Sequence, residues 1–164
     1  RHGTRARDVT RKLSRLVASM RKEAYSCFVK DTQRYVSILQ DIAWITVQYR
    51  TLNRGAELSE LRTDTAIVGP NNSCIVFQVT LSKVIRGDGA QEFGAPALPN
   101  DPTCPVRAFL EYRAESNREL GWDWDTGSLP AFPYIGQRGD RLSPVTPQAM
   151  GQRFHKHLER CNLT

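Results

Sequence analysis

The stretch Thr32–Arg50, TQRYVSILQDIAWITVQYR, combines helical spacing with a wide apolar surface. Its apolar residues recur three or four positions apart, and further ones widen the stripe: Val36, Leu39, Ile42, Ala43, Trp44, Ile45 and Val47. A helix that is apolar over so much of its surface is covered by other elements. The pattern therefore predicts a largely buried helix over residues 32–50.

Shorter patterns on both sides predict further helices. Asp8–Tyr25 is basic and amphipathic, with apolar residues at the spacing i, i+3, i+4, i+7: Leu13, Leu16, Val17 and Met20. The triplet Asn53-Arg54-Gly55 breaks the central helix, and Ala56–Arg62 is expected to form a short third helix.

The periodicity then changes to that of strands. Apolar residues alternate with mostly polar ones from Ile75 to Leu81, and Ala66–Val68 precedes them across a turn at Gly69–Asn72. Gly87-Asp88-Gly89 is a turn signal. Phe93–Leu98 is expected to be a third strand, and Pro96 confines it to an edge. We expect an antiparallel sheet of two or three strands.

Helical signals return in the last third of the chain. The segment Asn100–Thr103 is expected to separate the strands from the next helix. Pro105 stands in the first turn of that helix, which we expect to extend to Leu120. Residues 121–144 predict a long loop, after which Thr146-Pro147 opens a last helix that runs to about Cys161. The expected fold class is α+β and mostly helical, with helices flanking the small sheet.

Composition excludes some classes of protein. The chain has 164 residues, 40% of them hydrophobic and 24% charged, which is typical of one globular domain. No apolar run approaches the roughly 20 residues of a membrane span. Because the chain starts at Arg1 without an initiator Met, we expect it to be a piece of a longer protein. The four cysteines lie far apart, which favours reduced thiols in an intracellular protein.

Positive charge is concentrated at the start of the chain. The net charge is +6, and residues 1–30 alone hold nine basic and two acidic residues. We therefore divide the chain into a basic leading helix, 1–30, and a domain, 31–164. A basic end on a nearly neutral body favours a polyanionic partner, whereas the structural alternative is a solvated tail.

Familiar catalytic and metal motifs are absent from the sequence, including phosphate-binding glycine loops and zinc-ligand spacings. His155 and His157 are two apart, which places them on different faces of a helix, so we expect no metal site and no cofactor.

What remains is Arg54–Arg62, RGAELSELR, between the apolar helix and the strands. This segment resembles the first conserved box of the tyrosine recombinases, the phage-integrase-like enzymes. Ser82-Lys83 stands where that family has a hairpin lysine, and Leu98–Leu110, LPNDPTCPVRAFL, is similar to the helix start of Crypton- and DIRS-type members. Leu129–Pro133, Leu142-Ser143 and the helix after Thr146 match later segments in order.

The resemblance covers about residues 30–164 and implies a reaction. A tyrosine hydroxyl attacks a DNA phosphodiester and leaves a 3′-phosphotyrosyl link and a free 5′-hydroxyl. In that reaction Arg54 would contact two non-bridging oxygens, as a planar guanidinium can. Lys83 would protonate the leaving oxygen as a general acid, and Glu57 would hold Arg54 from one helical turn away.

The same residues also have structural interpretations. Arg54 could bind the last carbonyls of the preceding helix, because cations favour that end. Lys83 could be an edge charge that prevents aggregation, and Glu57 a surface carboxylate.

The sequence departs from the family pattern in three places. Thr63 stands where many members have Trp. The second catalytic box and the nucleophilic tyrosine are not found, and His157-Leu-Glu-Arg160 fits the H-x-x-R of that box only by coincidence, inside the helix that normally precedes it. We therefore expect that this chain alone does not cleave DNA.

The sequence thus predicts the DNA-binding part of a tyrosine recombinase from a eukaryotic mobile element or a gene derived from one. The alternative is a domesticated, non-catalytic DNA-binding or scaffold protein with the same fold, and an unrelated nucleic-acid-binding protein ranks last. Expected partners are duplex DNA and further copies of the protein on DNA, with no membrane, and the expected location is the nucleus. The candidate phosphate contacts are Arg5, Arg7, Arg11, Lys12 and Arg15.

Overall fold

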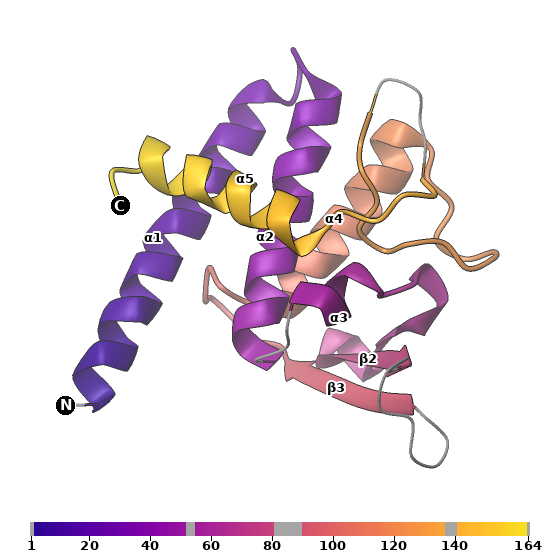
Figure 1. Cartoon of the computed structure of the whole chain (residues 1–164), viewed down its shortest axis with the longest axis horizontal. Coiled ribbons are helices and arrows are strands. Elements are labelled where there is room, and N and C mark those ends of the chain that lie inside the picture. Colours follow the sequence, from indigo (N-terminus) through magenta and orange to yellow (C-terminus); the bar gives the residue numbers. More distant parts are fainter. Residues whose placement is uncertain (1, 52–54, 81–89, 137–140, 164) are drawn as a thin grey trace.

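The computed structural model describes residues 2–51, 55–80, 90–136 and 141–163, although the side chains of 2–6, 79–80 and 90–91 are not described. Its main elements run in the order α1 (His2–Cys27), α2 (Thr32–Thr51), α3 (Gly55–Ser59), β1 (Ala66–Val68), β2 (Cys74–Thr80), β3 (Ala90–Pro96), α4 (Pro105–Leu120) and α5 (Pro147–Arg160) (Figure 1). The expected α+β, mostly helical class is confirmed.

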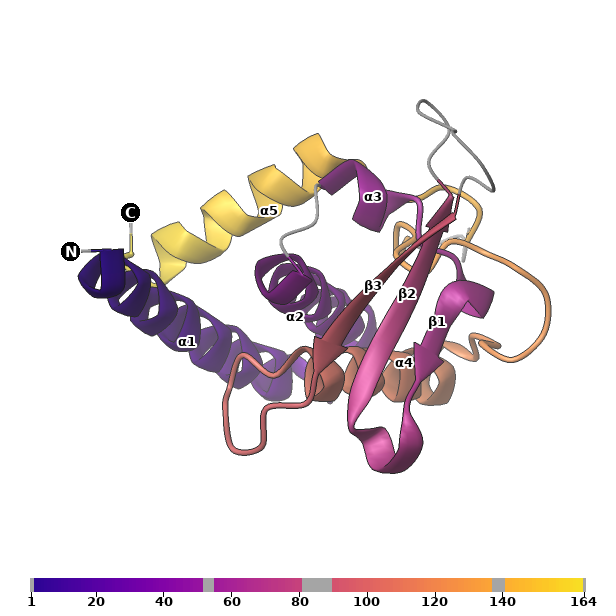
Figure 2. The same ribbon diagram turned by 90° about the horizontal axis from the view of Figure 1, so that it is seen from below.

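The helix α2 occupies the middle of the molecule. It packs against α1, α4 and α5 and also touches β3. Figure 2 shows the sheet on one side of α2 and the helices α1 and α5 on the other. Eleven of its twenty residues are buried, which confirms the expectation of a covered helix.

The sheet is antiparallel with the order β1-β2-β3. Phe77 in β2 pairs with Ala66 in β1 and with Phe93 in β3, so β2 is the central strand. Pro96 ends β3 at the edge of the sheet, as its missing N–H requires. The third strand spans 90–96 instead of the expected 93–98, and the turn expected at 87–89 lies outside the described residues.

Two helix boundaries were wrong in the sequence analysis. The helix α1 begins at His2 rather than at Asp8, and α3 ends at Ser59 rather than at Arg62. The helix α3 ends early because the residues that follow it form hydrogen bonds with the long connection after α4. Ala131 N donates to Leu61 O at 2.8 Å, and Thr63 N donates to Leu129 O at 2.8 Å.

Helix starts follow the local sequence. Thr146 caps α5 by accepting a hydrogen bond from Ala149 N at 3.1 Å, and Pro147 occupies the first turn. The cap of α4 is Cys104, whose sulfur accepts from Arg107 N, and Gly121 ends that helix at a φ of 70°. Such a left-handed end favours glycine.

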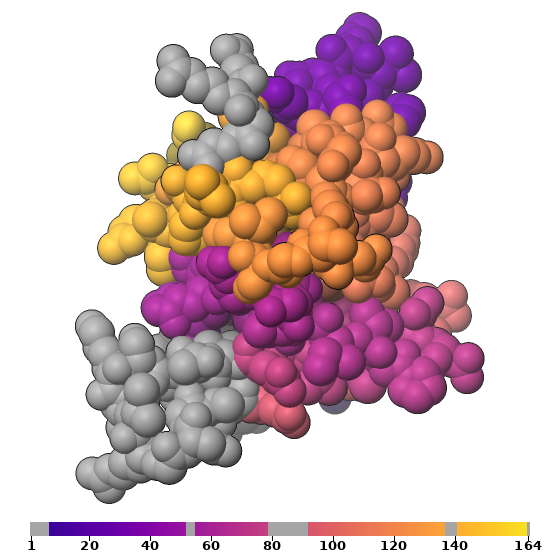
Figure 3. All heavy atoms as spheres, turned by 90° about the vertical axis from the view of Figure 1, so that its right-hand side faces the viewer, coloured from indigo at the N-terminus to yellow at the C-terminus, as the bar shows by residue number. Residues whose placement is uncertain are grey.

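An aromatic cluster joins the sheet, the helices and the connection between α4 and α5. Tyr112 of α4 stacks on Phe132 of the connection with ring centres 5.6 Å apart. Phe132 also meets the edge of Trp44 at 5.3 Å, and Phe109 meets Phe77 at 5.4 Å. The side view in Figure 3 shows this connection lying against α3 and α4.

The N-terminal helix shares this core. Its Leu16, Val17 and Met20 are buried in one cluster with the apolar residues of α2. The expected boundary at residue 30 falls in the turn between α1 and α2. None of the helices in the described ranges is long and apolar enough to span a bilayer.

The burial of Phe132 gives a test of the fold. Phe132→Ala is expected to lower the free energy of unfolding by about 3–5 kcal/mol, because it removes a fully buried ring that packs against aromatic residues of α2 and α4. Val29→Ala, at a residue 87% exposed, is the control and should change it by less than about 0.5 kcal/mol. Urea titration followed by tryptophan fluorescence measures both, and equal effects would contradict the aromatic core.

Candidate nucleic-acid interface

The two residues that the sequence analysis proposed as catalytic lie outside the described residues. Arg54 immediately precedes α3 in the sequence, and Lys83 falls between β2 and β3. Glu57 is described and lies half-buried on α3. Of the three residues proposed for the reaction, the structure thus describes only Glu57.

The short helix α3 is fixed against the start of α5. Leu58 is fully buried, and Ser59 Oγ donates to Val145 O at 2.7 Å. A Cβ atom on Gly55 would lie 3.0 Å from the Cβ of Pro147, so this close approach favours glycine. The backbone from Gly55 to Ser59 is thus held in place by its contacts with Val145 and Pro147.

The second arginine of the motif holds the connection between α4 and α5. Arg62 Nε donates to Ser128 Oγ at 3.1 Å, and its backbone forms a bridge with Pro130. Thr63 is buried, and its Oγ1 accepts from Leu129 N at 3.2 Å. In this part of the motif, the side chains of Arg62 and Thr63 hold the connection between α4 and α5 in place.

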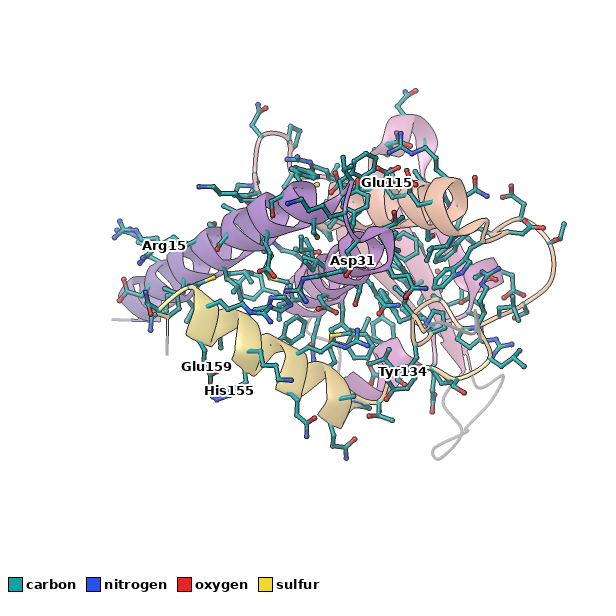
Figure 4. All side chains as sticks on the ribbon, turned by 90° about the horizontal axis from the view of Figure 1, so that it is seen from above. Arg15, Asp31, Glu115, Tyr134, His155 and Glu159 are labelled. Carbon is teal, nitrogen blue, oxygen red and sulfur yellow. The ribbon has the colours of Figure 1, made fainter. Side chains whose placement is uncertain are left out.

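The basic side chains of α1 form an exposed row. Arg7, Arg11 and Arg15 follow one another four positions apart, and we call these three residues the basic stripe. They and Lys12 are exposed and form no ion pair within the described part of the chain. Figure 4 shows Arg15 on the outer side of α1. Arg5 belongs to α1, but its side chain is not described.

The orientation of the basic stripe is set by contacts on the other side of α1. Thr10 and Tyr49 join their hydroxyls at 2.7 Å. Further along, Arg21 is almost fully buried and donates to Pro102 O at 2.8 Å, with Glu111 at 3.5 Å. These contacts hold α1 to the core, so the three arginines of the basic stripe face solvent.

A buried polar cluster that the sequence analysis missed joins α2 and α5. Asp41 is 3% exposed, and its two oxygens face His157 Nε2 at 2.9 Å and Arg153 Nη1 at 3.0 Å. We call Asp41, Arg153 and His157 the Asp41 cluster. A carboxylate enclosed in this way needs its partners, because an unpaired buried charge is costly.

The two neighbouring histidines have different surroundings, as their spacing predicted. His157 is buried in the Asp41 cluster, and its Nδ1 has no partner among the described residues. His155 is exposed and contacts Glu159 at 2.9 Å on the outer side of α5 (Figure 4). No group of three or more potential metal ligands gathers within the described ranges.

Gln40 extends the cluster into the aromatic core. Its Oε1 accepts from Arg153 Nη1 at 3.0 Å, and its Nε2 donates to Tyr112 Oη at 3.0 Å and to Pro133 O at 2.7 Å. Complete burial raises the pKa of Tyr112, against the opposing effect of the hydrogen bond from Gln40. The phenol therefore stays protonated and donates to Ala131 O at 2.7 Å.

Comparison with known proteins adds no family assignment. No protein-family model and no curated protein matches the chain. The functional interpretation consequently depends on the motif order and on the geometry described above.

Removal of the central carboxylate tests the Asp41 cluster. Asp41→Ala is expected to lower the free energy of unfolding by about 3–5 kcal/mol, because it leaves the buried His157 and the partly buried Arg153 without their carboxylate partner. Asp125→Ala, at an exposed aspartate in the long connection, is the matched control and should stay within about 0.5 kcal/mol of wild type. A small effect of Asp41→Ala in urea unfolding would contradict a structural role.

Proposed function

We propose that the chain is the DNA-binding part of a tyrosine recombinase, an enzyme that breaks and rejoins duplex DNA through a 3′-phosphotyrosyl intermediate. The observation that carries the proposal is the position of the motif in the fold. RGAELSELR spans the start of α3, directly after the central helix and directly before a three-stranded antiparallel sheet, and α4 and α5 follow. This is the order in which the resemblance puts the same segments.

The packing of α3 supports a role for Arg54 at a phosphate. Glu57 stands one helical turn after Arg54, and Gly55 and Leu58 fix the backbone between them. Positioned guanidinium groups lower the barrier when negative charge develops on phosphate oxygens. Lys83 follows β2 in the sequence and would act as the general acid.

The basic stripe supports duplex DNA as the partner. Three arginines four positions apart cover about 12 Å of helix at 1.5 Å per residue, which suits contacts to successive phosphates. Contacts of this kind position a protein without reading the base sequence. Further copies of the protein would bind paired sites on the same DNA, and such a substrate implies a nuclear location.

A second candidate is a domesticated DNA-binding or scaffold protein with the same fold and no catalysis. The observation that favours it is that all residues of the basic stripe lie on α1, so DNA binding by the stripe requires no residue of α3. The two candidates share DNA binding and differ in cleavage.

The contribution of the stripe can be measured on one residue. Arg11→Gln is expected to weaken binding to duplex DNA by about ten- to a hundredfold, because one charge-assisted contact contributes about 1.5–3 kcal/mol. The loss should be the same for unrelated duplex sequences, as expected for a phosphate contact. Fluorescence anisotropy with labelled duplexes at constant salt measures it.

Lys30→Gln is the control, because Lys30 is equally exposed but stands in the turn at the other end of α1. It should leave the affinity near that of wild type. Equal losses for both variants would mean that only overall charge matters and would remove the stripe as the binding surface.

Cleavage separates the two candidates. In a recombinase that contains this domain, Arg54→Ala should slow formation of the covalent link to a nicked duplex by about 100-fold or more while leaving most of the binding. The link is detected as a protein–DNA band that survives denaturation. Wild-type protein that binds but forms no link would favour the scaffold, and unchanged cleavage by Arg54→Ala would reject Arg54 as a catalytic residue.

A further inference from the structure

A polar pocket of about 370 Å³ opens between the start of α2 and the second half of α5. Four cationic side chains line it: Arg34 from α2 and Arg153, Lys156 and Arg160 from α5. The three α5 residues have the spacing i, i+3, i+7, which brings them to one face of the helix. The pocket includes no residue of the basic stripe.

The acidic groups around the pocket already have partners. Asp31 accepts a hydrogen bond from Arg34 N at 3.1 Å at the start of α2, and Asp41 is held by Arg153 and His157. Glu23 of α1 accepts from both Arg34 and Arg160, so one carboxylate serves two guanidinium groups. Lys156 is exposed and has no partner in the described part of the chain. The pocket therefore keeps an excess of positive charge.

Arg153 is oriented in advance at the base of the pocket. Its Nη1 donates to Gln40 Oε1 and to Asp41 Oδ1, both at 3.0 Å, while its side chain stays 25% exposed. Its Nε and Nη2 have no hydrogen-bond partner among the described residues, although the guanidinium lies over the ring of Tyr134 at 5.9 Å from the ring centre. A guanidinium held at one nitrogen keeps its other donors in a fixed direction, which lowers the entropy cost of binding an oxyanion.

We propose that this pocket binds a phosphate group. Arg153 donates to two of its oxygens, and Lys156, one helical turn further, supplies a third charge-assisted contact. The site goes beyond the proposed function, because it lies on α2 and α5 and includes no residue of the basic stripe or of α3. The phosphate belongs either to a nucleic-acid backbone or to a free phosphorylated compound, and both present the same oxygens.

Inorganic phosphate is the first probe. Titration of the whole chain at constant ionic strength, with chloride as the balancing ion, should move the backbone amide NMR signals of α5 and of the start of α2 in a saturable way. Lys156→Gln should weaken this binding roughly tenfold, since it removes one charge-assisted contact. Because Lys156 is exposed, this variant keeps the Asp41 cluster and its fold.

Lys22→Gln is the matched control, since it removes the same charge from an exposed position on α1 that belongs neither to the basic stripe nor to the pocket. Its phosphate affinity should equal that of wild type. Shifts that do not saturate, or equal weakening in both variants, would overturn the proposal and assign the binding to general positive charge.

Duplex DNA then identifies the source of the phosphate. If duplex DNA displaces inorganic phosphate and Lys156→Gln also weakens DNA binding, the pocket holds a backbone phosphate. If phosphate stays bound in the presence of duplex DNA, the ligand is a free phosphorylated compound. Failure of the proposal for the basic stripe can be recognised separately, because Arg11→Gln tests DNA binding by the stripe without changing the pocket.

Discussion

The burial of most of α2 is the constraint on which the rest of the structure depends. An apolar helix exposed to water would lose most of its hydrophobic stabilisation. The helices α1, α4 and α5 and the sheet therefore enclose it. The same enclosure buries the polar side chains of Gln40 and Asp41 among the apolar residues, and these two side chains need hydrogen-bonding partners. Arg153 and His157 meet that demand, which fixes α5 across α2.

Sequence periodicity predicted the elements that depend on local pattern. The central helix and the first two strands are where their apolar spacing puts them, and Thr146 caps α5 as expected. The end of α3 was wrong because hydrogen bonds from Leu129 and Ala131, about 70 residues further along, determine it. No local pattern carries that information.

The Asp41 cluster could not be predicted from the sequence, because its members come from distant parts of the chain. His157 and Arg160 were interpreted only as a chance match to H-x-x-R, and the partner of His157 lies 116 residues earlier. A signal was present, since Gln40-Asp41 interrupts the apolar run of a helix expected to be buried. Such an interruption predicts a buried polar contact but does not identify its partner. The catalytic roles proposed for Arg54 and Lys83 still depend on the resemblance, because both residues lie outside the described ranges.

The central claim is that the chain binds duplex DNA through phosphate contacts, and its salt dependence tests this most directly. Each neutralised phosphate changes the slope of log K against log salt concentration by about −0.9. Three arginines of the stripe with Lys12 predict a slope of about −3 to −4 for the wild-type chain on a duplex of arbitrary sequence. A slope near zero, or no measurable binding at low salt, would contradict the account.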